Sequence, residues 1–299
     1  MTSDAPTPKA PAITLMQSAD AFRYAEMLAA TARTVRTYAE ARGYAYEQFQ
    51  GTKYGVHPWH ACFNRIFMLA EMVERGVTGW VCHMDADAWI NDLSFDLAGF
   101  LADKQDAAAV FTPSGSSDEW WDVNDGVFLI NLDSPAARRL IADWKAATLQ
   151  AWPQIAHHSN FPPGGPDDQS LLHILLAEGD YRAHVRLDDG RVMNTPDARF
   201  IRQHLRSLSA TFAIRLGRIR EAVNAVLSSH TVHGTDDLAR AMQTVEGLYL
   251  GILNRPADQG IDNPYVRTIL DSGLRDGVEL VAGYLIDSGE FQSSSRGAG

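Results

Sequence analysis

The feature that most constrains the fold of this chain is an apolar segment that ends in two carboxylates. Residues 80–91 read WVCHMDADAWIN, so a run of β-prone residues leads directly into Asp85 and Asp87. Because side chains alternate along extended backbone, both acids are predicted to point to the same side of a single strand. Two carboxylates held together repel each other unless a cation or a proton intervenes, and a hard divalent cation with oxygen ligands resolves the repulsion. The segment therefore predicts a buried strand with a cation site at its end.

The D-x-D pattern is weak evidence when it is taken alone. In a chain of 299 residues with this much Asp, the pattern is expected by chance about twice. The alternative interpretation is a solvated strand end or a turn. The apolar run before Asp85 and the aromatic Trp89 after Asp87 favour the cation site.

Composition excludes several classes of protein. The chain is 45% hydrophobic with a formal net charge of -11, which indicates a large core and makes a duplex nucleic-acid surface an improbable partner. No run approaches the ~20 apolar residues of a membrane span. The first twelve residues, MTSDAPTPKAPA, lack the pattern of a secretory signal, and Cys62 and Cys82 lie in apolar segments typical of reduced, buried thiols, with a disulfide as the alternative. These features predict a cytoplasmic protein.

Hydrophobic periodicity alternates between strands and helices. Strands are expected over residues 12–19, 44–50 and 80–90, with helices over 21–42 and 60–74 between them. This order is typical of an α/β fold with a mostly parallel sheet and helices on its faces. Ligands bind beyond the carboxyl ends of the strands in such sheets, which is where the two acids are placed.

Further elements are expected downstream. They are strands over 107–112, 126–132 and 184–191, helices over 97–101, 135–148 and 168–178, and a Gly/Pro-rich loop over 157–166. Trp120 and Trp121 lie in a polar segment, where they could stack on a sugar ring or base, or anchor a loop to the core.

Several phrases then match one family in order and spacing. They are RTYAEARGYAYE, the nearby Trp59, WVCHMDADAWI, NDGVFLINLD, DDQSLLHILL and FIRQH. Over residues 12–206 the chain resembles the GT-A glycosyltransferases, and within them the family of galactomannan galactosyltransferases, xyloglucan xylosyltransferases and fungal mannan mannosyltransferases. The resemblance implies a GT-A domain, Rossmann-like with helices on both faces of the sheet, over about residues 12–230.

The resemblance also implies a set of site residues. Asp85 and Asp87, with His204 as third protein ligand, would hold Mn²⁺ or Mg²⁺ against the diphosphate of a UDP- or GDP-linked sugar. The transfer would retain the anomeric configuration and give an α-linked product from an α-linked donor. The other implied residues are Asp167, Asp168 and Gln169 on the reacting side, and Asn124 and Gly126 at the sugar pocket.

The chain departs from the family pattern at the diphosphate. The family's histidine is usually followed by Gly and Lys, whereas Leu205 and Arg206 follow His204, and the lysine expected soon after Trp59 is absent. Arg206 or Arg202 could serve the phosphate instead, because a guanidinium pairs bidentately with phosphate oxygens.

The rest of the chain divides into a basic segment and a small helical unit. Residues 200–229 form a basic amphipathic segment, which extends the GT-A domain from about residue 207. The segment either touches an anionic membrane surface that carries a lipid-linked acceptor, or packs on the catalytic domain with its Arg side chains in solvent. Residues 236–292 resemble a short bacterial helical domain of unknown function, similar to phycobilisome linker domains, with RPAD at 255–258, Gly260 and SGEF at 288–291 as its marks. This implies an accessory contact with a protein or glycan. Residues 1–11 and 293–299 read as flexible tails.

Together these features predict a metal-dependent, retaining hexosyl- or pentosyltransferase of bacterial polysaccharide biosynthesis. Its acceptor would be a glycan, a lipid-linked sugar or a protein, and it would be cytoplasmic or peripheral at the inner face of the membrane. Two alternatives stay open: a non-catalytic scaffold that binds sugar nucleotides or glycans, and a phosphatase of the haloacid dehalogenase type. The latter usually has Thr or Val two residues past the second acid, where this chain has Trp89.

Overall fold

The computed structural model describes residues 12–162, 164–230, 235–258 and 263–296. Two compact units are present, Met1–Val223 and Asn224–Gly299. The expected tail at 1–11, the end of the tail at 297–299, Gly260 and residues 231–234 lie outside the described residues.

The first unit is built on a six-stranded sheet. Its order is β2-β1-β3-β6-β5-β7, in which β1 pairs in parallel with β2 and β3, and β6 runs antiparallel to both of its neighbours. The strands are β1 (Ile13–Ala19), β2 (Ala45–Gln50), β3 (Trp80–Asp85), β5 (Ala109–Pro113), β6 (Val123–Asn131) and β7 (Val185–Leu187). The expected mostly parallel α/β sheet is confirmed.

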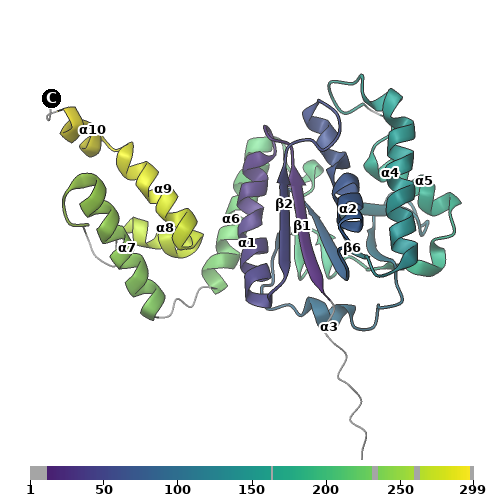
Figure 1. Cartoon of the computed structure of the whole chain (residues 1–299), viewed down its shortest axis with the longest axis horizontal. Helices are drawn as coiled ribbons and strands as arrows, with labels where there is room; N and C mark the ends of the chain where they lie inside the picture. Colours follow the sequence, from purple (N-terminus) through teal and green to yellow (C-terminus); the bar gives the residue numbers. More distant parts are fainter. Residues whose placement is uncertain (1–11, 163, 231–234, 259–262, 297–299) are drawn as a thin grey trace, which may run out of the picture. The chain divides into compact units, whose positions relative to one another are not determined.

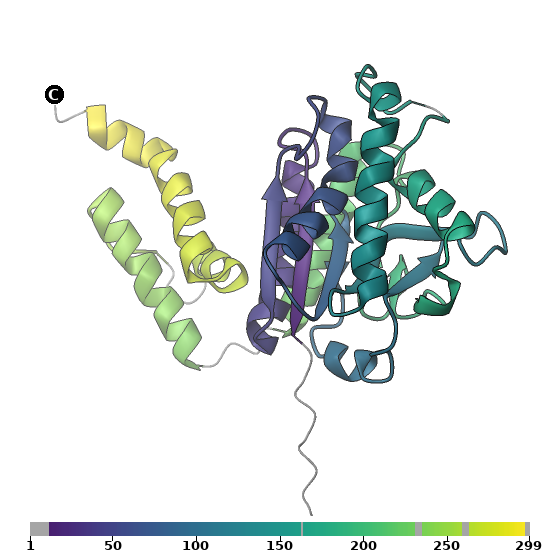
Figure 2. The same cartoon turned by 45° about the vertical axis from the view of Figure 1, so that its right-hand side comes forward.

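A second, three-stranded sheet lies beside the first, and helices cover both. It has the order β4-β9-β8, formed by β4 (Ala88–Ile90), β8 (Met193–Thr195) and β9 (Ile201–Gln203). The helices are α1 (Ala25–Arg42), η1 (Pro58–Phe63), α2 (Asn64–Glu74), α3 (Leu97–Leu101), α4 (Pro135–Ile155), α5 (Asp168–Glu178), η2 (Arg182–His184), η3 (Arg206–Leu208) and α6 (Phe212–His230). Figures 1 and 2 show α1 and α6 on one face of the six-stranded sheet and α2 and α4 on the other.

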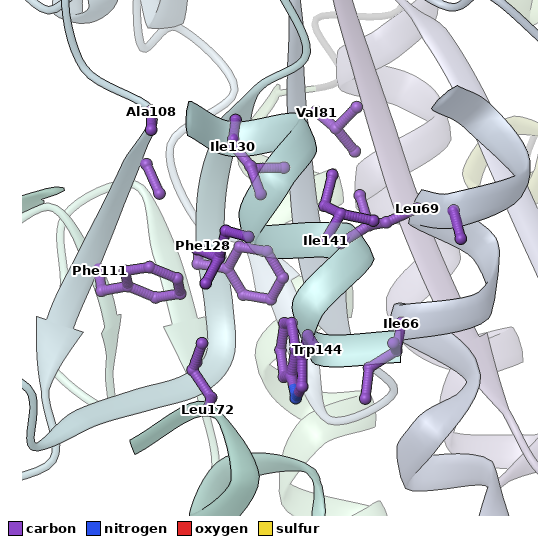
Figure 3. Packing of buried hydrophobic residues seen from close by; sticks show 14 of the residues in the cluster. Ile66, Leu69, Val81, Ala108, Phe111, Phe128, Ile130, Ile141, Trp144 and Leu172 are labelled. Atoms are coloured by element: carbon purple, nitrogen blue, oxygen red, sulfur yellow. The ribbon is translucent and has the colours of Figure 1, made fainter. Parts of the chain in front are cut away.

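The main core lies between the sheet and the helices α2 and α4. Phe128 of β6 packs toward Trp144 of α4, and Ile66 of α2 completes the layer (Figure 3). Each of these side chains is fully buried, which stabilises the fold by roughly 1.5–3 kcal/mol per residue. Helix α4 begins where the sequence predicts, because Ser134 caps it and Pro135 occupies its first turn.

The segment that carries the two acids is not one strand. Strand β3 ends at Asp85, the chain turns at Ala86 and Asp87, and β4 then joins the second sheet by pairing with β9. The fully buried amide of Gln17 stabilises this turn by donating to the carbonyls of Asp85 (3.2 Å) and Ala88 (3.1 Å), and the Thr31 hydroxyl donates to the carbonyl of Ala86 (3.0 Å). The expectation of a single strand over 80–90 is therefore wrong, and strand alternation is not what orients the acids.

The second unit is helical, as predicted. Its helices are α7 (Thr235–Leu253), α8 (Pro264–Ser272), α9 (Leu274–Ile286) and α10 (Gly289–Arg296), so α10 continues into the segment expected to be a tail. Helices α8 and α9 approach closely at Gly277, where a Cβ would lie 2.7 Å from Cα of Ile269. Arg255 joins the loop after α7 to α10 by pairing with Asp258 (2.8 Å) and Glu290.

None of the described helices is both long enough and apolar enough to cross a membrane. Both cysteines are free thiols.

Candidate functional site

A cleft of about 670 Å³ opens beyond the carboxyl ends of β1 and β3. Its lining comes from the loop after β1, from η1, from the turn after β3, from residues 159–161 and from Arg206 and Arg215. Asp85 and Asp87 both line it, which is where the sheet topology places a ligand.

The two acids converge through Gln203 at the end of β9. Its Nε2 donates to Asp85 Oδ2 (3.2 Å) and to Asp87 Oδ1 (3.0 Å), so one oxygen of each acid lies within reach of a single nitrogen. A Cβ at Gly126 would overlap the amide of Gln203. Glycine at this position therefore leaves the space in which Gln203 bridges the acids.

Arg65 of α2 is the centre of a buried charge cluster. Its guanidinium pairs with Asp85 (2.6 Å), Asp125 (3.0 Å) and Asp168 (3.1 Å), and it also donates to the carbonyl of Asp125. The Arg65 side chain is 7% exposed, so these pairs lie largely out of water. Three carboxylates from β3, β6 and α5 are thus held together by one cation.

Burial and charge change the pKa values in this cluster. Burial raises the pKa of Asp168 to about 6, against the opposing effect of Arg65, and it raises the pKa of Asp125 well above its ordinary value. Burial also acts to raise the pKa of Asp85, but Arg65, His83 and Arg215 together outweigh it, and the net shift of this pKa is downward. The cluster therefore keeps Asp85 ionised while Asp125 and Asp168 take up protons more readily.

A second arginine holds the other acid. Arg215 of α6 forms an ion pair with Asp87 Oδ2, donates from Nε to the His204 carbonyl (2.7 Å) and donates to the Tyr24 hydroxyl (3.3 Å). Arg215 is 5% exposed, and Leu216 beside it is buried too. The basic segment therefore packs on the first unit, but the expectation that its arginines lie in solvent is wrong for Arg215.

His204 and Arg202 do not reach the acids through their side chains. The His204 ring bonds through Nε2 to the Ser209 hydroxyl (2.8 Å), and only its backbone N–H meets the Asp87 carbonyl (3.2 Å). Arg202 donates to the carbonyl of Ala198 (3.0 Å) and is not part of the cleft lining. No three His, Cys, Asp or Glu side chains in the described ranges are grouped to hold a metal ion.

The Asp-Asp-Gln phrase, Asp167 to Gln169, lies at the start of α5, where Asp168 pairs with Arg65. Asp167 caps α5 by accepting from the Ser170 N–H (2.7 Å), which is the ordinary structural role of an acid at a helix start. The Oε1 of Gln169 accepts from the Asp125 N–H (3.3 Å). This phrase is therefore joined to the charge cluster by Asp168 and Gln169 rather than by Asp167.

Asn124 lies near the start of β6 and joins this strand to the second sheet. Its Oδ1 accepts from the Gly126 N–H (2.8 Å), and its carbonyl accepts from Nδ2 of Asn194 (3.0 Å). Trp120 and Trp121 do not line the cleft, and they pack against the main core, as the anchoring interpretation predicts.

Arg65, Asp125 and Gln203 are site residues that the sequence reasoning missed, and Arg215 was named only as part of a basic segment. An arginine on the apolar face of a predicted helix, as at Arg65 in HACFNRIF, was the available signal. Asp125 lies inside the NDG phrase and Gln203 inside FIRQH, so both are adjacent to predicted site residues.

Comparisons with known proteins bear on the fold. No protein-family model and no curated protein sequence matches the chain. Among solved structures, the chain is similar to a glycosyltransferase involved in the glycosylation of the major capsid of PBCV-1, with a TM-score of 0.54 and 13% identity over 71% of this chain and 100% of that one.

Two further likenesses are more distant. They are to the glycosyltransferase GlyE of Streptococcus pneumoniae TIGR4 (TM-score 0.37, 13% identity, 61% of this chain and 46% of that one) and to the bifunctional glycosyltransferase WbbM (TM-score 0.37, 11% identity, 73% and 46%). The TM-score of 0.54 to the capsid-glycosylating enzyme indicates a shared fold. The first unit is therefore a mixed α/β domain of the GT-A type.

Proposed function

We propose that this protein is a metal-dependent, retaining glycosyltransferase that moves a sugar from a nucleotide-diphosphate donor to an acceptor. The observation that carries the proposal is the convergence of Asp85 and Asp87 on one point of a cleft that arginines also line. A GT-A type fold places that cleft beyond the carboxyl ends of the parallel strands.

The two acids fit a divalent cation. Each uses one oxygen for an arginine, Asp85 for Arg65 and Asp87 for Arg215, and turns the other toward Gln203. The inward oxygens are hard donors of the kind that Mn²⁺ and Mg²⁺ take. Asp85 and Asp87 would hold the cation, which would supply electrostatic stabilisation of the leaving diphosphate.

Arginines replace the lysine that the family uses at the diphosphate. Arg206 and Arg215 line the cleft and both donate to the Tyr24 hydroxyl, at 3.4 Å and 3.3 Å. Two guanidiniums beside one phenol give a local concentration of positive charge for phosphate oxygens. Arg206 is the better supported of the two candidates drawn from the sequence, since Arg202 bonds elsewhere.

The reacting side is assigned to Asp168 and Gln169 at the start of α5 and to Asn124 in β6, none of which is in the lining of the cleft itself. Positive charge develops at the anomeric carbon during glycosyl transfer, and acids or amide oxygens nearby stabilise it. Asp168, whose carboxylate pairs with Arg65 at 3.1 Å, would be the acid on this side. The product expected from an α-linked donor is α-linked.

An uncharged part of the cleft is the proposed approach for the acceptor. Pro58, Trp59 and Phe161 line the cleft, the rings of Trp59 and Phe161 meet edge to face at 5.6 Å, and the Trp59 indole donates to the His158 carbonyl (2.7 Å). Aromatic surfaces of this kind suit the apolar face of a pyranose. Trp59→Ala is expected to raise KM for a sugar acceptor more than it lowers the affinity for UDP.

The acceptor classes stay as the resemblance implies: a glycan, a lipid-linked sugar or a protein, with transfer of a hexosyl or a pentosyl group. The helical unit, through its contacts with a protein or glycan, would bring that acceptor to the cleft. A location in the cytoplasm or at the inner face of the membrane accords with such acceptors.

The test is release of UDP or GDP from a panel of sugar nucleotides in the presence of Mn²⁺. We expect turnover that Asp85→Ala and Asp87→Ala each abolish while circular dichroism stays unchanged. Near-normal turnover by either variant would contradict the site. Hydrolysis of phosphate esters without a sugar nucleotide would indicate the phosphatase alternative, and nucleotide binding without turnover would indicate the scaffold.

A further inference from the structure

The side-chain amide of Gln203 forms hydrogen bonds through one of its two polar atoms and not through the other. Nε2 donates to both acids, whereas Oε1 is buried and has no hydrogen-bond partner within the described part of the chain. Gln203 itself is 4% exposed. A buried amide oxygen without a partner is unfavourable, because its desolvation is not offset.

A half-turn of this amide would exchange the two atoms. Oε1 would then lie where Nε2 lies now, about 3 Å from Asp85 Oδ2 and from Asp87 Oδ1. Three oxygens that face one point repel one another when nothing lies between them, and they suit a divalent cation when one does. Oε1 accepts no hydrogen bond in its present position, so the exchange breaks only the two bonds from Nε2 and moves the N–H groups to the side that Oε1 now occupies.

Two further observations, at Gly126 and at the His204 ring, favour Gln203 as the residue that faces the two acids. A side chain at Gly126 would occupy the space of the Gln203 amide, so this amide is accommodated by the strand that carries the site. The His204 ring, which the family resemblance offers as third ligand, is bonded to Ser209 instead. The described carboxylates and imidazoles do not form a three-membered cluster, whereas the two acids and this amide do converge.

We infer that Gln203, through Oε1, is the third protein ligand of the divalent cation, in place of His204. This inference rests on the proposed function, since it concerns the same cation. The ligand set is then entirely oxygen, which favours hard ions, so Mg²⁺ is expected to support the site about as well as Mn²⁺. In the free protein the amide faces the acids with its N–H groups, and with the cation it faces them with its carbonyl.

The test measures Mn²⁺ binding to the full chain by electron paramagnetic resonance, with no donor sugar present. Gln203→Leu keeps a similar size but removes the oxygen, and we expect it to weaken Mn²⁺ binding at least about tenfold, since even outer partners of metal sites contribute about 10–100-fold. Gln203→Glu retains an oxygen at this position and adds a charge, so it is expected to bind Mn²⁺ as well as the natural chain or better. His204→Gln is the matched control and is expected to stay within about twofold.

Two further measurements separate a ligand from a merely structural residue. Gly126→Ala moves the Gln203 amide without changing its chemistry and is expected to weaken Mn²⁺ binding as Gln203→Leu does. Electron spin echo modulation of bound Mn²⁺ is expected to lack the signal of a directly bound imidazole nitrogen. Such a signal, lost in His204→Gln, would overturn the inference and restore the histidine.

The outcomes also separate this inference from the proposed function. If Asp85→Ala and Asp87→Ala abolish Mn²⁺ binding while Gln203→Leu does not, the inference alone is overturned. If the natural chain binds no Mn²⁺, with or without UDP, both are overturned. If Gln203→Leu and the acid variants all lose Mn²⁺ and His204→Gln does not, both are supported.

Discussion

Arg65 and Arg215 each pair with one acid of the same turn, but their surroundings differ. Arg65 lies on the core helix α2 among three carboxylates that come from β3, β6 and α5. Arg215 lies on α6 with one carboxylate, one carbonyl and one phenol as partners. Arg65 is thus outnumbered by negative charge, whereas Arg215 is matched to a single acid at the cleft wall.

The difference indicates a division of roles. A guanidinium that pairs with three carboxylates, two of them buried, cannot leave them without exposing uncompensated charge, so Arg65 serves the structure of the site. A guanidinium with one acid and two neutral partners can take up a phosphate at little cost, so Arg215 serves the ligand.

The largest effect is expected from Arg65→Ala. Removal of the guanidinium leaves Asp85, Asp125 and Asp168 together without a cation, and breaking a buried pair in this way costs about 3–5 kcal/mol. Urea denaturation should show that loss in the free energy of unfolding. Arg65→Lys restores the charge but not the three-way geometry, so part of the loss should return. A cost below about 1 kcal/mol would mean that the cluster is solvated and that the two arginines are alike.

A smaller and different effect is expected from Arg215→Ala. The Arg215–Asp87 pair is also buried, so the variant should lose about 3 kcal/mol of stability, less than Arg65→Ala because one carboxylate rather than three loses its cation and Asp87 retains its bond to Gln203. Its affinity for UDP in the presence of Mn²⁺ should fall about tenfold, which is about 1.4 kcal/mol. Isothermal titration calorimetry measures this directly, and an unchanged affinity would remove Arg215 from the diphosphate site.

The sequence predicted the secondary-structure elements around this site better than the side-chain contacts within it. The strands of the six-stranded sheet, the α4 start at Ser134 and the position of the acids at the sheet edge all follow from local patterns, namely periodicity, capping and chain order. Strands β8 and β9 of the second sheet were not predicted. The convergence of Asp85 and Asp87 was also predicted, but from alternation along one strand, whereas the structure achieves it with a turn held by Gln17.

The residues that were missed make contacts across long stretches of the chain. Arg65 meets Asp168, and Gln203 meets Asp85, only after the sheet has brought distant segments together. No local pattern encodes such pairs, because an isolated Arg or Gln in a sequence is most often a surface residue. The resemblance placed the metal set on His204, one residue after the amide that faces the acids.

The pH dependence of the free energy of unfolding tests the charge cluster around Arg65 and not the Arg215 pair. Since burial raises the pKa of Asp168 from 3.8 to about 6, its native form binds protons more readily than its unfolded form. Stability linked to this group is therefore fully present below pH 3.8 and is lost as pH rises through 6. Between pH 5 and pH 7 the free energy of unfolding should fall by about 1 kcal/mol. Urea denaturation at both values should show this fall, Asp168→Asn should reduce it and leave the contribution of Asp125, whose pKa burial also raises, and a rise in stability over this range would contradict the assignment.

The smallest effect is expected from Arg220→Ala. This variant tests whether the affinity for UDP depends on the specific contacts of Arg215 or on the overall charge of α6. Arg220 lies five residues after Arg215 on the same helix and pairs with Glu26 at 3.2 Å, but its side chain is 52% exposed. An exposed pair contributes about 0–1 kcal/mol and is weakened by salt, so the variant should unfold within about 0.5 kcal/mol of the natural chain and bind Mn²⁺ and UDP equally well. A loss of UDP affinity as large as that of Arg215→Ala, disappearing at 1 M salt, would show that α6 attracts the diphosphate through its overall charge. Burial would then no longer distinguish Arg215 from its neighbours on α6.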